Sequence, residues 1–233
     1  MAAEPENPTD YRGDSGHQVV VWDPLVRIGH GLLVLFFFVA YFTEDDLLTI
    51  HSWAGYGVGI YIIVRVIWGF IGPRHARFAD FAYGPRKAAL YMKDLMLFQA
   101  RRYLGHSPAG GLMVFLLLFS LTATTVTGVA LLAVEENAGP LAPWLGYEAG
   151  LEKSILALGP LAAPALASED ENHENEYENN DEEKGEALEE IHEFFSNLIL
   201  LLVIMHIAGV ALASIVYKEN LARAMVTGRK RSQ

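Results

Sequence analysis

The chain has 233 residues, enough for one domain of moderate size, and 52% of them are hydrophobic, against about 45–50% in soluble proteins. Its net charge of −11 is unevenly spread, because residues 169–193 hold 13 acidic side chains and one lysine and leave a net of +1 for the rest. An apolar, nearly neutral chain with one acidic insert excludes an ordinary soluble enzyme and a nucleic-acid binder, which would need a basic surface. The absence of cysteine excludes disulfides, thiolate metal sites, iron–sulfur clusters and covalently attached haem.

Four segments are long and apolar enough to cross a bilayer, which takes roughly 20 residues in a helix. Residues 1–20 are polar and lack the apolar stretch of a cleavable signal peptide, so they are predicted to form an N-terminal tail. The sequence therefore predicts an all-α membrane protein, a four-helix transmembrane bundle within residues 21–231. We expect its spans at residues 25–43, 48–71, 109–134 and 191–217.

Basic residues gather on one side of the predicted membrane. Seven Lys and Arg residues lie between the second and third spans and five follow the fourth, whereas the segments on the other side hold only Lys153 and Lys184. Positively charged loops are retained in the cytoplasm. Both termini are therefore expected on the cytoplasmic side.

The segment at residues 168–190 is rich in Glu, Asn and Asp. It is of low complexity and too charged to bury a core, so we expect it to be disordered. With the termini in the cytoplasm it lies on the outer side. There it is a solvated spacer, a collector of cations or a docking surface for a basic partner.

Four of the eight histidines lie in predicted spans, where ionisable side chains are costly and are functional candidates. His192 and His206 are 14 residues apart, which puts both on one side of a helix and about 21 Å apart along its axis. Since successive spans run in opposite directions, His51 is expected at the depth of His192 and His30 at the depth of His206. Two imidazole pairs at two depths favour two haems, each held between two axial ligands.

Other interpretations of the same histidines remain. A zinc site usually needs four ligands in one small cluster, which two histidines at each depth do not supply. A histidine-based metal ion transporter, with the acidic segment as its outer collector of cations, is an alternative of another class. A membrane anchor whose histidines only pack against neighbouring helices is a third. His17, His75 and His173 lie in polar segments and are expected to be ordinary surface residues.

Two further residues are candidates near the cytoplasmic side. Arg65 lies well inside the second span, where an unpaired charge is expensive. It is expected either to bind a haem propionate or to extend to the cytoplasmic interface. His106 immediately precedes the third span. Three glycines of the second span, Gly55, Gly57 and Gly59, would let a flat macrocycle or another helix approach it.

Six sequence motifs complete this description. They are VWDPLVRIGH in the first span, IHSWAGYGVG and RVIWGFIGPRHA in the second, YLGHSPAGG before the third, IHEFFSNLILLLVIMHIAGVALAS in the fourth and KENLARAMVTGRKR at the end. Together and in this order they resemble the bacterial cytochrome b561 family, which also includes the b-type cytochrome subunits of membrane-bound nickel–iron hydrogenases. The resemblance covers residues 21–231.

The resemblance implies two haem b groups between the four helices and electron transfer in the respiratory chain of the bacterial inner membrane. It implies a carrier between membrane quinone or quinol and a periplasmic redox partner such as a c-type cytochrome, with quinol:cytochrome oxidoreductase activity. The b-type subunit of a hydrogenase is the alternative within the family, and a homodimer is an expected assembly. His106 would be an alternative ligand, a quinone contact or a proton-transfer group. The implied axial haem ligands are His30, His51, His192 and His206.

Overall fold

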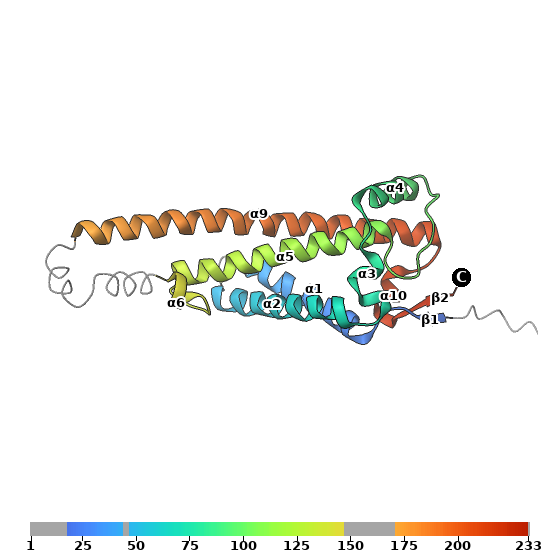
Figure 1. Cartoon of the computed structure of the whole chain (residues 1–233), viewed down its shortest axis with the longest axis horizontal. Helices are drawn as coiled ribbons and strands as arrows, with labels where there is room; N and C mark the ends of the chain where they lie inside the picture. The colour runs from blue at the N-terminus through green and yellow to red at the C-terminus, as the bar shows by residue number, and fades with distance from the viewer. Residues whose placement is uncertain (1–17, 44–46, 147–170, 233) are drawn as a thin grey trace, which may run out of the picture.

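The structure is a computed structural model that describes residues 18–43, 47–146 and 171–232, with side chains described from residue 184 onward in the last range. Four long helices run side by side (Figure 1). By length and composition all four are candidate membrane spans, and the span in the fourth runs over Lys184–Tyr217. The prediction of an all-α bundle of four membrane helices is therefore confirmed. These helices are α1 (Pro24–Phe42), α2 (Leu48–Ile71), α5 (Pro108–Glu135) and α9 (Glu171–Tyr217).

Two of the long helices begin with the same local chemistry. The side chain of Asp23 accepts hydrogen bonds from the backbone N–H groups of Leu25 and Val26, and that of Ser107 accepts one from Gly110. A proline follows each cap at the first helical position, where its missing N–H costs nothing. These caps set the starts of α1 and α5 within one residue of the predicted spans.

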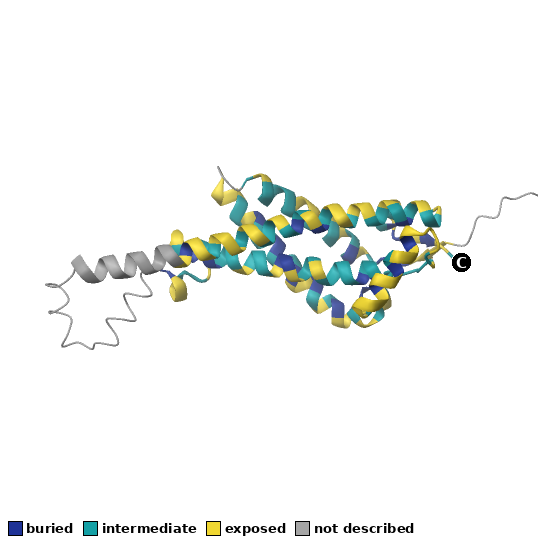
Figure 2. Cartoon of the chain, turned by 90° about the horizontal axis from the view of Figure 1, so that it is seen from above, coloured by how far each residue is buried: buried dark blue, intermediate teal, exposed yellow. Residues whose placement is uncertain are grey.

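The bundle is held together by a small apolar core. α5 packs against α9 and α2, and α2 also packs against α1. Val58 and Ile62 of α2, Leu121 of α5 and Ile199 of α9 are buried together, with aromatic rings of α1 around them. Many other apolar residues of the spans are exposed, and Figure 2 colours such exposed positions yellow along the long helices. This is the distribution expected of helices that face lipid rather than water.

Short elements cover one end of the bundle, which we call the basic end because it carries the two basic segments. A two-stranded antiparallel ribbon pairs Val20 near the start of the described chain with Arg229 near its end. At the opposite end, called the acidic end, lie the short helix α6 (Ala142–Leu145) and the extension of α9 (Figure 1). The elements of the basic end are η1 (Arg74–Ala76), α3 (Phe78–Phe81), α4 (Pro85–Met96), α10 (Leu221–Thr227), β1 (Gln18–Val20) and β2 (Arg229–Arg231).

The acidic segment differs from its prediction. Residues 171–190 are not disordered but form the first part of α9, while residues 168–170 lie outside the described residues. Glu has a good helix propensity, and negative charges in the first turns of a helix interact favourably with its dipole. The segment also continues a membrane helix, so its helical conformation needs no new nucleus. Low complexity and high charge therefore did not imply disorder here.

Candidate cofactor sites

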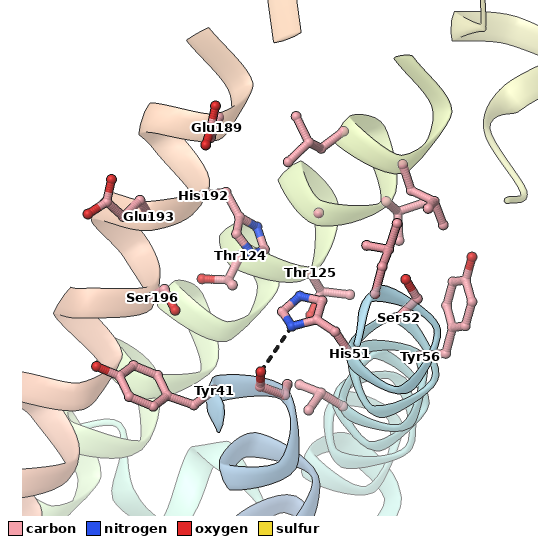
Figure 3. A pocket seen from close by; sticks show the side chains of 18 of the residues that line it. Tyr41, His51, Ser52, Tyr56, Thr124, Thr125, Glu189, His192, Glu193 and Ser196 are labelled. Atoms are coloured by element: carbon pink, nitrogen blue, oxygen red, sulfur yellow. Dashed lines mark hydrogen bonds between the residues drawn. The ribbon is translucent and has the colours of Figure 1, made fainter. Parts of the chain in front are cut away.

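A cavity of about 540 Å³ opens between the four long helices at the acidic end. His51 at the start of α2 and His192 in α9 both line it, and their ring centres are 6.1 Å apart (Figure 3). Imidazole nitrogens bind metal ions such as zinc at about 2 Å, so two rings on one ion have their centres about 6 Å apart. The spacing of these rings suits two ligands of one metal.

The second nitrogen of each ring is held by a neighbouring helix. Nδ1 of His51 lies 2.9 Å from the backbone carbonyl oxygen of Ala40 in α1. Because a carbonyl only accepts, this nitrogen carries the proton and donates. Nδ1 of His192 lies 3.1 Å from the hydroxyl of Thr127, which also lies 2.9 Å and 3.1 Å from the carbonyl oxygens of Ala123 and Thr124. With the hydroxyl proton on either carbonyl, Nδ1 of the ring donates to the hydroxyl oxygen. In that tautomer Nε2 of both rings keeps a free lone pair, the arrangement usual in metal-binding histidines.

Glycines give these rings and the cavity their room. A Cβ at Gly128 of α5 would lie 2.8 Å from Cε1 of His192, so only glycine lets this imidazole pack so closely against α5. Gly55 lines the cavity and faces open space. Gly57 and Gly59 instead lie against Phe36 of α1 and Thr125 of α5. The sequence prediction considered the glycines of α2 but missed Gly128, whose role depends on a contact between two distant helices.

Four carboxylates surround the mouth of this cavity. They are exposed side chains at the end of α5 and in α9; in Figure 3 Glu189 lies above His192 and Glu193 to its left. Among the described residues, no lysine or arginine lines the cavity. A cofactor here would therefore lie in a negative electrostatic field. The four residues, called the acidic rim, are Glu135, Glu136, Glu189 and Glu193.

The other two membrane histidines lie nearer the basic end. His30 of α1 and His206 of α9 are both half-buried and close enough for their charges to interact. The buried core around Ile199 occupies the level between this pair and the pair at the acidic end. The structure therefore places His51 beside His192, and His30 within electrostatic range of His206.

Arg65 is buried rather than extended to the interface. It is only 5% exposed, and its guanidinium carbon lies 4.9 Å from the ring centre of Phe78 and 5.8 Å from that of Phe81. Its Nη1 is buried without a hydrogen-bond partner. A buried guanidinium that stacks on two rings and keeps an unpaired N–H is suited to bind an anion.

His106 lies close to Arg65 at the basic end. Its ring centre is 4.2 Å from that of Phe81 and 4.7 Å from that of Trp22, and its Nδ1 is buried without a partner. Burial, together with the positive charges of Arg65 and Lys230, lowers the pKa of His106 to about 3, although Asp80 acts in the opposite direction. His106 is therefore neutral at physiological pH.

One pair of residues at the basic end was missed from the sequence. Nδ1 of His75 in η1 lies 2.9 Å from a carboxylate oxygen of Asp80 in α3. Both side chains line a second cavity, of about 310 Å³, together with His106. His75 had been interpreted as an ordinary surface residue, because only the turn between α2 and α3 brings it to this position.

The fold and its paired histidines define a class of protein: a helical membrane protein that can hold a metal-containing cofactor between helices. The family model described as prokaryotic cytochrome b561 matches residues 21–228, and the chain belongs to this family. Membership makes it a transmembrane b-type haem protein of electron transfer. Comparisons with curated proteins and with solved structures gave no match.

Proposed function

We propose that the chain binds two haem b groups, one between His51 and His192 and one between His30 and His206. It passes electrons between membrane quinone or quinol and a periplasmic redox partner such as a c-type cytochrome. Bound haem supplies an iron that changes between the ferrous and ferric states. The observation that carries the proposal is the hydrogen bonding of His51 and His192, which leaves Nε2 of two facing rings for one metal.

The site at the acidic end fits a haem for two further reasons. Its cavity lies within the range of volumes of cofactor sites, about 300–1,000 Å³. Within the described residues no group of three or more His, Cys, Asp or Glu side chains could hold a metal ion. A porphyrin supplies four ligands of its own, so two histidines suffice. Metal ion transport has less support, because a bare ion needs more ligands than each pair offers.

The site at the basic end is supported by unpaired donors. Three buried N–H groups there lack a hydrogen-bond partner: Nε of Arg27 in α1, and Nη1 of Arg65 and Nε1 of Trp68 in α2. Buried polar groups are rarely left unpaired, so such a cluster suggests a bound anion. Haem propionates are anions that a haem between His30 and His206 would bring to this end. We assign Arg65 to one of them.

The charge distribution supports an orientation with the basic end in the cytoplasm of a bacterial inner membrane. Both termini of the described chain lie at this end (Figure 1). Quinone exchange is assigned to the same end, where His106 adds a buried, unpaired nitrogen near Arg65. The acidic rim and the acidic part of α9 then face the periplasm. A basic rim on a c-type cytochrome would be steered toward them.

A spectrum of the purified protein tests the haem assignment. The reduced-minus-oxidised difference spectrum should show b-type bands, and pyridine haemochrome analysis should give two haems per chain. His51→Ala should retain one haem, whereas His173→Ala, which changes a histidine outside the spans, should retain both. One haem per chain in the unaltered protein would contradict the proposal. Reduction of the haems by a quinol, followed by oxidation by a basic c-type cytochrome, tests the electron route.

A further inference from the structure

The second cavity contains groups that neither haem uses. It lies at the basic end, has a volume of about 310 Å³ and is lined by residues of η1, α3 and the segment before α5. Besides the hydroxyls of Tyr83 and Tyr103, the lining includes three imidazole or carboxyl groups that can carry protons: His75, Asp80 and His106. Arg74, at its mouth, has a side chain that is 82% exposed, so the cavity is open to solvent.

His75 and Asp80 form the solvent-facing part of this cavity. Their 2.9 Å contact joins an imidazole to a carboxylate, and the other oxygen of Asp80 accepts from Nε of Arg74 at 3.4 Å. Both side chains keep access to water, with exposed fractions of 28% and 22%. Gly105 lies against the pair, since a Cβ there would come within 2.9 Å of Nδ1 of His75. Gly105 directly precedes His106 in the chain, so this close approach brings the pair of His75 and Asp80 next to the segment that carries His106.

His106 forms the buried part. Its unpaired Nδ1 has almost no exposure, although the residue lines the cavity. Arg65 from α2, Lys230 from β2 and His75 from η1 disfavour its protonation, and Asp80 from α3 favours it. With a pKa of about 3, roughly one molecule in ten thousand holds the second proton at pH 7. Such an imidazole can accept a proton on one nitrogen and release one from the other, but does not store it.

We propose that His106, His75 and Asp80 form a proton path between the quinone site and the cytoplasmic water. The inference rests on the proposed function. Each quinol that is oxidised breaks two O–H bonds and yields two electrons and two protons; bound haem would supply the acceptor of the electrons. The protons pass through His106 to the pair of His75 and Asp80, and from there to water. When quinone is reduced instead, its two protons are taken up from the cytoplasmic water along the same path.

The test uses the haem-loaded protein in nanodiscs and two electron donors. Duroquinol releases protons when it is oxidised, whereas hexaammineruthenium(II) does not. Asp80→Asn should slow haem reduction by duroquinol at least tenfold and leave reduction by hexaammineruthenium(II) unchanged. Asp94→Asn, an exposed aspartate of α4, is the matched control and should behave as the unaltered protein. A pH-indicator dye should record a matching delay in proton release in the Asp80→Asn variant.

Two further measurements separate proton transfer from a structural role. Azide, a small weak acid, should restore the duroquinol rate of Asp80→Asn, which it would not do for a misfolded site. His106→Gln should keep both haems and their midpoint potentials but lose the same rate. Loss of a haem in this variant would make His106 an axial ligand and would overturn the path.

The remaining outcomes are also decisive. Three results for Asp80→Asn would overturn the proton path: an unaltered duroquinol rate, equal slowing with both donors, or no rescue by azide. Each of them would leave the haem assignment standing. If hexaammineruthenium(II) reduces the unaltered protein but duroquinol does not, the quinone proposal is overturned, and the proton path with it.

Discussion

The two ends of the bundle hold similar histidine pairs in opposite electrostatic surroundings. At the acidic end His51 and His192 lie beneath four exposed carboxylates and, in the described part of the chain, no lysine or arginine lines their cavity. At the basic end the buried cations are Arg65, at 5% exposure, and Lys230, at 7%. The guanidinium of Arg65 is stacked on Phe78 and Phe81, and Nζ of Lys230 lies 5.4 Å from the ring centre of Trp22.

This difference shows how one scaffold would make the two proposed haem sites unequal. A ferric haem carries one positive charge more than a ferrous haem, so nearby carboxylates stabilise the oxidised form and nearby cations the reduced form. The haem at the acidic end is therefore expected to have the lower midpoint potential. The ligands can be identical, because the surroundings set the potential.

Removal of an axial ligand should have the largest effect. We expect His51→Ala and His192→Ala to lose the haem at the acidic end, and His30→Ala and His206→Ala to lose the other, because each pair is proposed to hold one iron. Haem stoichiometry and redox titration of the four variants measure this. If His30→Ala and His51→Ala abolished the same redox component, the pairing would be wrong.

Removal of the buried cation at the basic end should have the next largest effect. Arg65→Ala should lower the midpoint potential of the haem at that end by on the order of 60 mV, a tenfold change in its reduction equilibrium, because the ferrous form loses a positive neighbour. Partial loss of this haem is expected with it. Potentiometric titration is the measurement, and Arg77→Ala, which changes an exposed arginine at the same end, is the control. A shift of the other haem would contradict the assignment.

Neutralising the acidic rim should shift potentials in the opposite direction and by less. Glu189→Gln combined with Glu193→Gln should raise the potential of the haem at the acidic end by roughly 10–30 mV at low salt, since both side chains are exposed and screened. The increase should shrink at 1 M salt. Equal potentials of the two haems in the unaltered protein would remove the basis of this comparison.

The smallest expected effect concerns the ion pair that closes the basic end. Arg102 donates to Glu219 at 3.0 and 3.2 Å, and the backbone N–H of Arg231 donates to the same carboxylate at 3.0 Å. Burial opposes the charge of Glu219, but these bonds hold its pKa below the ordinary value. The stabilisation is therefore present at neutral pH and is lost as the pH falls through the lowered pKa.

We expect Arg102→Ala to destabilise this end by about 1–2 kcal/mol at pH 7, because the pair is only partly shielded from water. Hydrogen exchange of β1 and β2 measures the loss. The difference from the unaltered protein should shrink once the pH is low enough to protonate Glu219, and the part that remains belongs to the hydrogen bond from Nη2 of Arg102 to the backbone carbonyl of Arg231, which does not titrate. A difference that does not change with pH would mean that the charge of Glu219 contributes nothing to this end.

Much of the bundle could be predicted from the sequence because its determinants are local. Hydrophobic length set the spans, the caps at Asp23 and Ser107 set two helix starts, and helix geometry placed His51 at the depth of His192. The remaining features depend on contacts between distant segments. The close packing of His192 on Gly128 and the pairing of His75 with Asp80 appear only when the elements are assembled. The acidic helix was missed for another reason: its composition suits both disorder and a solvated helix.

The β1–β2 ribbon has a consequence for the order of biogenesis. It joins residues at opposite ends of the chain, so it cannot form until the last membrane helix has been synthesised and inserted. Lys230 reaches Trp22 only through this pairing. The cover over the basic end is therefore completed last. Until then that end of the bundle is uncovered, which would give a cofactor held there an entry route before the ribbon forms.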